Sequence, residues 1–407
     1  MSNPLYTLVG LLVAIGYPAG FEPLAFARRP EWAPWAALAA LLLFAGIARL
    51  LIGRFRRPAL GRFALRLLAL LFYAVLVYVF HFPLWTWSLG LEEGGLASTL
   101  LSLAPLFALY GVLAALSARA DPRRGGLAFA FRGFLGLSRL PILAMLLLEE
   151  MFRQAAPLRR AAFVYPWIGW AASAGAMALL MALLPPVLRF VWAARPLAHG
   201  PLRERLEGIC RAADFRCREL LEVGTGGSGM ANAFVVGVAP LGKYVFFTDG
   251  ILRGMAPEEL ECVAAHEIVH SKRRHISFYL VFALGFSLLT ALAQEGAEAA
   301  GITQAVAIPA GLAWMTLFWG GGFGYVSRRF ETEADLVAAR IAPAGAMGMA
   351  AALERVAALN GVPPWAPSWR HFSIARRIEI LARVADDPAF GAAFERGCAR
   401  LRAAALA

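Results

Sequence analysis

Long apolar stretches alternate with short polar segments along most of the chain. A helix of about twenty apolar residues is long enough to cross the hydrocarbon layer of a membrane. Such stretches predict seven spans, at residues 4–21, 33–48, 67–89, 96–116, 161–184, 276–293 and 303–326. An eighth, weaker stretch at 134–148 is interrupted by Arg139 and Pro141. The first stretch lacks both a basic segment before it and a clear cleavage site after it, so we expect it to be retained.

The pattern becomes more polar between residues 193 and 275. An amphipathic helix is predicted at 203–213, then a strand at 219–223 and a hairpin of two strands at 234–238 and 244–248. Pro257, Glu258 and Glu259 suit the first turn of a helix, which is predicted to run to residue 274. The glycine-rich segment 224–229 has no GK[ST] ending and is therefore interpreted as a flexible loop.

Composition agrees with a membrane protein. Hydrophobic residues make up 60% of the 407 residues and charged residues only 16%, against about a quarter in soluble domains. The formal net charge of +12 comes mostly from arginines that flank the spans. We therefore expect them to contact lipid headgroups rather than nucleic acid. The four cysteines (Cys210, Cys217, Cys262 and Cys398) have no metal-site spacing and are expected to be reduced thiols.

The distribution of arginine predicts the orientation in the membrane. Six arginines without an acidic residue lie between the second and third spans: Arg49, Arg54, Arg56, Arg57, Arg62 and Arg66. The next loop carries Glu92 and Glu93 instead. Because basic loops stay in the cytoplasm, we expect the segment around Arg273 inside and the 294–298 turn outside. This requires 134–148 to span if the N-terminus is inside; with seven spans the N-terminus is outside and the basic loop is an exception.

The most specific motif is His266-Glu267-Ile268-Val269-His270, an HExxH sequence on the predicted 257–274 helix. Residues four apart lie on one helix face, so His266 and His270 can bind one zinc ion while Glu267 lies beside its open coordination position. His275 follows nine residues after His266 and is expected to point elsewhere on this helix, at the membrane edge. The motif indicates a metallopeptidase.

A catalytic zinc usually has three protein ligands, and a second acidic motif offers the third. Glu331 and Asp335 are one helical turn apart just after the last apolar stretch. We expect Glu331 to ligate the zinc and Asp335 to orient a zinc-bound histidine. The expected reaction is peptide-bond hydrolysis by a zinc-activated water, with Glu267 as the general base.

Several motifs in this order resemble the membrane-embedded gluzincin peptidases of the type I CAAX prenyl endopeptidase and HtpX family. They are Asn232-Ala233-Phe234, the segment 248–252, HExxH, Glu331 with Asp335, and His371 followed six residues later by Arg377. The resemblance covers about residues 220–381. It implies that His371 and Arg377 stabilise the oxyanion, Arg377 directly or by support, and that Asn232, Ala233 and Phe234 border the substrate cleft. His371 is followed by Phe372 where relatives often have proline.

The predicted fold is therefore mainly α: a polytopic transmembrane helical protein of seven or eight spans with a small α+β zincin-like peptidase domain that carries a β-hairpin. The predicted parts are an N-terminal transmembrane region (1–192), a first peptidase segment with the HExxH helix (193–275), a transmembrane hairpin (276–326) and a second peptidase segment with the third ligand (327–407).

The predicted protein is an integral membrane zinc endopeptidase, holding one Zn2+ per chain, of a bacterial inner membrane, with a cytoplasmic active site. Its expected partners are peptide or protein substrates and membrane lipids, without nucleic acid, and no motif defines an oligomeric state. A catalytically inactive zinc-binding scaffold is the alternative, although Glu267 is present. A transporter is disfavoured because few charges lie within the spans. Processing of prenylated CAAX tails and quality-control proteolysis both remain open.

Overall fold

The computed structural model describes the chain from Pro30 onward, except for residues 53, 55–57, 92–94, 121–153, 156, 158–159, 162–163, 226–229, 238–241, 367, 369 and 407. The chain divides into two compact units. The first consists of Met1–Ala193 with Gly224–Ser228, and the second of Ala194–Val223 with Gly229–Ala407. The predicted spans 4–21 and 134–148 lie outside the described residues.

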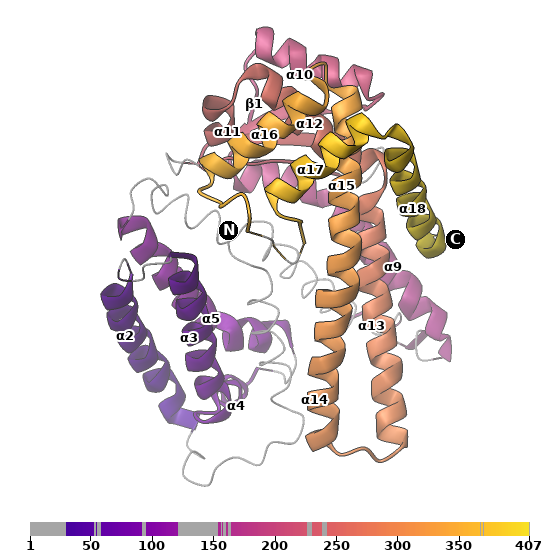
Figure 1. Cartoon of the computed structure of the whole chain (residues 1–407). Coiled ribbons are helices and arrows are strands. Elements are labelled where there is room, and N and C mark those ends of the chain that lie inside the picture. The colour runs from indigo at the N-terminus through magenta and orange to yellow at the C-terminus, as the bar shows by residue number, and fades with distance from the viewer. Residues whose placement is uncertain are drawn as a thin grey trace. The chain divides into compact units, whose positions relative to one another are not determined.

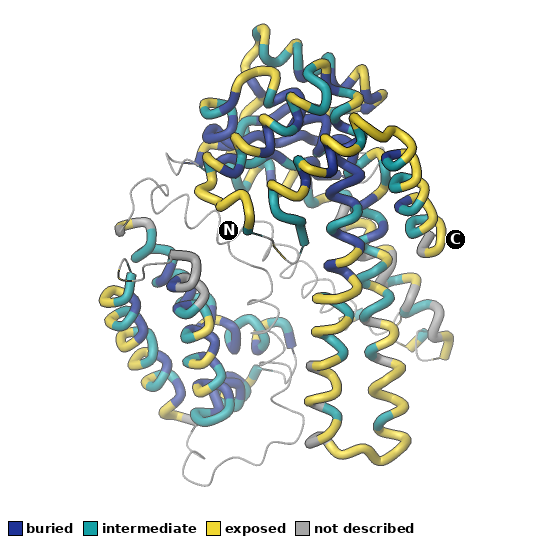
Figure 2. The backbone as a smooth tube through the Cα atoms, in the orientation of Figure 1, coloured by how far each residue is buried: buried dark blue, intermediate teal, exposed yellow. Residues whose placement is uncertain are grey.

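Apolar helices form the first unit. They are α2 (Ala33–Leu51), α3 (Pro58–Tyr78), α4 (Phe82–Ser88), α5 (Leu96–Ala120) and α9 (Pro166–Val191), with a short 3-10 turn η2 (Pro30–Trp32) before α2 (Figure 1). Helices α2, α3 and α5 pack around buried Phe44, Tyr73 and Leu106. The opposite faces of α2 and α3 carry exposed leucines, such as Leu42 and Leu71, and Figure 2 shows exposed positions along these helices. Apolar faces on both sides of a helix are typical of a membrane environment.

The predicted span 67–89 is broken in the structure. Helices α3 and α4 meet at an angle of 50°, with His81 between them in the left-handed backbone region at a φ of 49°. Among the described residues, three helices are long and apolar enough to span a membrane: Ala33–Leu51, Leu96–Ser117 and His275–Ala299. Counting the bent pair as one span gives up to four. The number of spans therefore stays a prediction.

A small sheet lies in the second unit, in the order β1-β2-β4-β3. Its strands are β1 (Arg195–Pro196), β2 (Glu219–Val223), β3 (Ala233–Val236) and β4 (Tyr244–Thr248). Strands β3 and β4 form the predicted antiparallel hairpin, with Phe234 opposite Phe246, while β2 pairs with β4 in parallel. β3 is the last strand in this order. The predicted strands 219–223 and 244–248 are confirmed, and the two-residue strand β1 is an addition to them.

The second unit also contains the helices α10 (Pro201–Ala212), α11 (Asp249–Gly254), α12 (Pro257–Lys272), α16 (Gly345–Leu359), α17 (Ile374–Asp386) and α18 (Pro388–Leu406). Helix α12 is central, because it contacts α10, α15 (Gly324–Ile341) and α16 as well as β3. Its buried face includes Leu260, Ala265 and Ile268. Neighbouring elements on several sides therefore fix the position of α12 and of the polar side chains that it carries.

A helical hairpin leaves this core. Helix α13 (His275–Ala299) runs beside α14 (Gln304–Met315), which continues through a π-helix η4 (Thr316–Phe323) into α15 (Gly324–Ile341) (Figure 1). The connection is Ala300–Thr303, slightly later than the predicted 294–298 turn. Aromatic rings join the two arms near the peptidase core, for example Phe282 and Phe318 with ring centres 4.3 Å apart. The mainly helical fold with membrane helices and a small sheet confirms the predicted fold class.

Candidate metal centre

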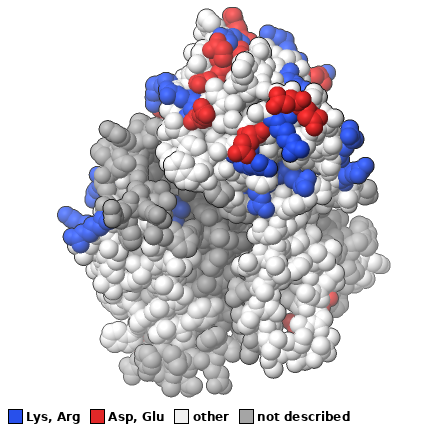
Figure 3. All heavy atoms as spheres, viewed as in Figure 1, with Lys and Arg blue, Asp and Glu red and all other residues white. Residues whose placement is uncertain are grey.

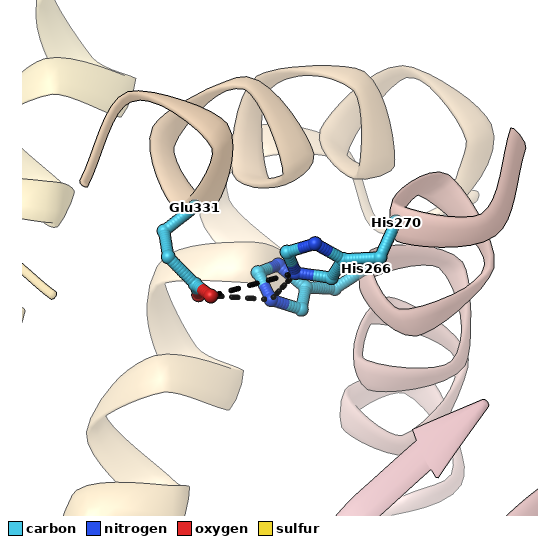
Figure 4. A group of neighbouring side chains, drawn as sticks. All are labelled: His266, His270 and Glu331. Atoms are coloured by element: carbon cyan, nitrogen blue, oxygen red, sulfur yellow. Dashed lines mark hydrogen bonds and ion pairs between the residues drawn. The ribbon is translucent and has the colours of Figure 1, made fainter. Parts of the chain in front are cut away.

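Helix α12 presents His266 and His270 from successive turns. The helix begins at Pro257, and Glu259 closes its first turn by accepting a hydrogen bond of 2.8 Å from the backbone N–H of Ala256. Both histidines lie on the side that faces α15, where Glu331 projects toward them (Figure 4). His266 and Glu331 are buried, and His270 is partly buried.

The three side chains converge on one point. Atoms that can ligate a metal lie within 4.8 Å of one another in His266, His270 and Glu331. The two Nε2 atoms are 3.2 Å apart, and the Glu331 carboxylate oxygens lie 3.5 Å from Nε2 of His266 and 3.7 Å from Nε2 of His270. Zinc binds such atoms at about 2.0–2.2 Å, so the edges of a tetrahedral site measure about 3.3–3.6 Å. The observed spacing fits a tetrahedral metal site.

The far nitrogen of His266 contacts a carboxylate. Nδ1 of His266 lies 2.9 Å from Oδ1 of Asp335. Arg377 in turn donates two hydrogen bonds to Asp335, of 2.7 and 2.6 Å. Burial raises the pKa of Asp335, but the nearby Arg377 and His266 lower it by a larger amount, so the pKa of Asp335 is lowered overall. The ionised carboxylate favours a proton on Nδ1 of His266 and leaves Nε2 as an acceptor.

The far nitrogen of His270 contacts His275. The two Nδ1 atoms are 3.0 Å apart, and Nε2 of His275 lies 2.9 Å from Oε2 of Glu333. The expectation that His275 points away from the site is therefore wrong, while its place at the start of the apolar helix α13 agrees with a position at the membrane edge. Helix α12 ends at Lys272, and Arg274 takes a left-handed conformation with a φ of 57°, so that His275 starts the new helix α13 and turns back toward the site.

Glu267 is partly buried beside His266. Burial raises its pKa to about 7, and the nearby charge of Glu331 adds to this, while His266, Arg377 and Arg370 lower it. A carboxyl group with a pKa near neutrality can both accept and return a proton. This environment suits the general base that the motif predicts.

His371 and Arg377 come from the segment around the start of α17. Nδ1 of His371 lies 3.1 Å from Oε2 of Glu331, and its side chain is 40% exposed. Ser368 holds the backbone of His371 through a 2.9 Å hydrogen bond from the His371 N–H to the Ser368 hydroxyl. The guanidinium of Arg377 lies 3.9 Å from Glu331, but both of its hydrogen bonds go to Asp335. Arg377 is therefore placed to support Asp335, whereas His371 borders the open side of the site.

The residues predicted to border the substrate lie at the edge strand. Asn232 precedes β3, and its backbone N–H donates to the Thr248 hydroxyl at 2.9 Å. Ala233 is buried, and the ring of Phe234 stacks on that of Phe246 with centres 5.1 Å apart. Strand β3 contacts α12, the helix that carries both histidines. The structure thus places the last strand of the sheet against the metal-site helix.

The sequence did not reveal every residue near the site. His275, Glu333 and Arg402 form a buried polar chain behind His270, and Arg402 pairs closely with Glu333. A signal was present, because Glu333 is an acidic residue between the two acids singled out as ligand and orienting group. Its partners are 58 and 69 residues away along the chain, so only the tertiary structure identifies them.

Comparison with known proteins supports the resemblance drawn from these motifs. Residues 196–384 match the model of peptidase family M48. Protease HtpX homologs of Thermoplasma acidophilum and Methanocaldococcus jannaschii are each 29% identical, over 32% and 39% of this chain and 43% and 51% of their own length. CAAX prenyl protease 1 of Saccharomyces cerevisiae is 27% identical over 24% of this chain and 23% of its length. The chain thus spans about half or less of these relatives.

The likeness extends to a solved structure. A crystal structure of S. mikatae Ste24p superposes with a TM-score of 0.50, at 15% sequence identity, covering 89% of this chain and 100% of that one. At this identity the match shows a common fold. Together with the family match, it confirms the resemblance to the HtpX and CAAX prenyl protease group.

Proposed function

Since residues 196–384 match the model of peptidase family M48, we propose that this protein is a zinc-dependent endopeptidase of the membrane. His266, His270 and Glu331 are the proposed ligands of a single Zn2+. One observation carries this proposal: two imidazole Nε2 atoms only 3.2 Å apart face the same carboxylate. With the Nδ1 protons directed to Asp335 and His275, both Nε2 lone pairs point into one space, where a cation relieves their repulsion.

The remaining side chains have distinct proposed roles. A zinc ion bound by this set would polarise the scissile carbonyl and acidify a water molecule. The carboxylate of Glu267 takes the proton of the attacking water and later delivers it to the leaving amine. His371 donates a hydrogen bond to the developing oxyanion. Asp335 fixes the ring of His266, and Arg377 holds Asp335 in place by its two hydrogen bonds.

The test separates the general base from the ligands. Glu267→Gln should retain about one zinc per chain and lose proteolysis by a factor of roughly 10²–10⁴, because the amide cannot accept the proton. Glu331→Ala should lose the metal. Zinc is measured by elemental analysis and cleavage with a fluorogenic peptide in proteoliposomes.

The matched control is Glu379→Gln, since Glu379 is an exposed acid on α17 that pairs only with Arg376 among the described contacts. It should change neither zinc content nor cleavage. Full activity in Glu267→Gln, or full zinc occupancy in Glu331→Ala, would overturn the corresponding role.

We further propose that the β3 edge binds the substrate backbone. An edge strand receives an extended chain by main-chain hydrogen bonds, and β3 lies against α12. Asn232, Ala233 and Phe234 are the proposed contacts. Cleavage should then require an extended segment close to the membrane, because α12 is followed almost at once by the apolar helix α13.

A proline scan of a cleaved peptide tests this binding mode. Proline should abolish cleavage where the substrate N–H must donate to β3, while alanine at the same positions has weaker effects, because proline lacks the donor. The alanine series is the control for side-chain loss. If proline is tolerated equally at all positions near the scissile bond, strand addition is rejected and the zinc chemistry is untouched.

The proposed organisation follows from the same reasoning. Residues 1–192 form the N-terminal transmembrane region, 193–275 and 327–407 the peptidase, and 276–326 the membrane hairpin. The arginines beside the site, including Arg273 and Arg328, favour a cytoplasmic face of the inner membrane. Relatives named as HtpX homologs and as a CAAX prenyl protease both match this chain, so substrate profiling must include prenylated and unprenylated peptides.

A further inference from the structure

The two histidines of the metal site are supported differently from behind. His266 contacts a carboxylate directly, through Asp335. Behind His270 an additional imidazole is inserted: His275 lies between His270 and the carboxylate of Glu333. Both carboxylates come from α15 and both are paired with an arginine, Arg377 and Arg402 respectively.

His275 is held tightly in this position. Its side chain and that of Glu333 are fully buried. The imidazole stacks on the ring of Phe330, with centres 4.2 Å apart and planes within 6°. Burying an ionised carboxylate is costly unless it is paired, and Glu333 is paired with Arg402 and lies 3.8 Å from Arg273.

The contacts define where the protons lie. A carboxylate only accepts, so the hydrogen bond between Glu333 and His275 requires the proton on Nε2 of His275. Nδ1 of the neutral ring is then an acceptor and must receive the proton from Nδ1 of His270. His270 is left with a lone pair on Nε2, the atom that faces Glu331. The series of hydrogen bonds from Glu333 through His275 to His270 thus selects the tautomer of His270 whose Nε2 can bind a metal.

An opposite arrangement is disfavoured by the same distances. Arg402 also lies 3.4 Å from Nε2 of His275, and a hydrogen bond donated there would place the proton on Nδ1. The carboxylate oxygen of Glu333 is nearer, at 2.9 Å from that nitrogen, and is itself in close contact with Arg402. Arg402 therefore donates to Glu333, and His275 does the same.

We infer that His275 is a positioning residue for the metal ligand His270, and that Glu333 on α15, held by Arg402 on the C-terminal helix α18, fixes the tautomer of His275. This inference rests on the proposed zinc site. A group that orients a ligand and raises its basicity typically strengthens metal binding about 10–100-fold. Because Arg402 pairs with Glu333, the metal affinity also depends on α18, which lies more than 100 residues after α12 in the sequence.

Zinc affinity of the full-length protein in detergent, measured by competition with a chelator, tests the inference. His275→Phe keeps an aromatic ring to stack on Phe330 but cannot accept a hydrogen bond, and it should weaken zinc binding roughly 10–100-fold. His275→Gln can accept from Nδ1 of His270 through its amide oxygen, so it should restore part of this loss. The visible spectrum of the cobalt-loaded protein should shift in His275→Phe and less in His275→Gln.

The control is Arg383→Gln. The guanidinium of Arg383 on α17 lies 4.1 Å from the ring centre of Phe390 on α18, and among the described contacts it touches neither His275, Glu333 nor Arg402. It should leave zinc affinity unchanged. This outcome would show that the effect of His275→Phe comes from the hydrogen bonds behind His270 and not from weaker packing of α18. Circular dichroism and gel filtration show whether His275→Phe folds. If it does not, Arg402→Gln removes the partner of Glu333 instead and should also weaken zinc binding.

The outcomes distinguish this inference from the proposed function. A wild-type protein without zinc affinity rejects the zinc site itself. A wild-type protein that binds zinc, with His275→Phe binding within twofold of it or with Phe and Gln equally impaired, rejects only the role of His275.

Discussion

Helices α2 and α12 bury their side chains in opposite ways. α2 hides small or aromatic residues such as Ala37 and Phe44 and exposes Leu42 and Leu50. α12 hides His266 and exposes the charged Glu258. On the face seen in Figure 3, charged side chains of both signs gather over the peptidase helices, while the described apolar helices show few. The two helices are thus built for different surroundings.

The two burial patterns indicate that α2 and α12 are surrounded by different solvents. A row of exposed leucines along one helix is typical of a surface covered by apolar matter, and for α2, which is long and apolar enough to span, this is the hydrocarbon of a membrane. Buried charges are tolerated in the peptidase core because each has a partner, as Asp335 has Arg377. Charged side chains, both paired in the core and exposed at the surface, therefore mark the part of the protein that lies in water.

The largest contrast should appear in accessibility. In Glu298→Cys, at the far end of α13, the thiol should react fully with an impermeant reagent added outside the cell, whereas in Lys272→Cys, beside Arg273, it should not react until the membrane is opened. Basic flanks stay in the cytoplasm, and the two ends of a spanning helix lie on opposite sides.

The background for this labelling should carry Cys217→Ser, because Cys217 is partly exposed while Cys210, Cys262 and Cys398 are buried. Detergent-opened cells provide the positive control for both positions. The reverse pattern would place the peptidase outside the cytoplasm, and equal labelling of both positions would show that α13 does not span.

The next largest effect should come from the buried ion pair. Arg377→Met leaves the carboxylate of Asp335, only 2% exposed, without its bidentate partner. Removing one partner of a buried pair costs about 3–5 kcal/mol. The neighbouring Arg376 pairs with Glu379 at the surface, so Arg376→Met should cost less than about 1 kcal/mol. Unfolding in detergent measures both, and equal losses would show that burial does not control the cost.

The sequence predicted those parts of the fold and site that depend on local spacing. His266 and His270 are one helical turn apart, and so are Glu331 and Asp335, so each pair could be assigned to one helix face. The structure brings the two pairs together, with His266 beside Asp335 at 2.9 Å. The strands at 219–223 and 244–248 could also be predicted, because each is a short apolar run flanked by turn residues.

The features that the sequence did not predict depend on breaks and on distant contacts. On an uninterrupted helix His275 would lie on the side opposite His266, since nine residues turn it by about 180° relative to that residue. The left-handed conformation of Arg274 ends α12 and redirects the chain. The bend at His81 similarly divides an apolar run that periodicity alone describes as one span. Pro83, in the first turn of α4, is a local signal for the break at His81, whereas the break at Arg274 has neither glycine nor proline beside it.

The smallest of these effects, and the most direct test of the comparison, comes from placing one charge on each exposed surface. Leu42 on α2 is 68% exposed and Met347 on α16 is 85% exposed. If exposure on α2 means lipid, Leu42→Asp should be penalised by about 2.5–3.5 kcal/mol in membrane insertion, while Met347→Asp at a water-facing position should stay within about 0.5 kcal/mol of the wild type. The inserted fraction of each variant resists carbonate extraction and can be measured against wild type, with Leu42→Ala as the control for lost side-chain volume. Equal insertion of Leu42→Asp and Met347→Asp would mean that both surfaces face the same solvent, and the contrast between α2 and the peptidase helices would then need another cause.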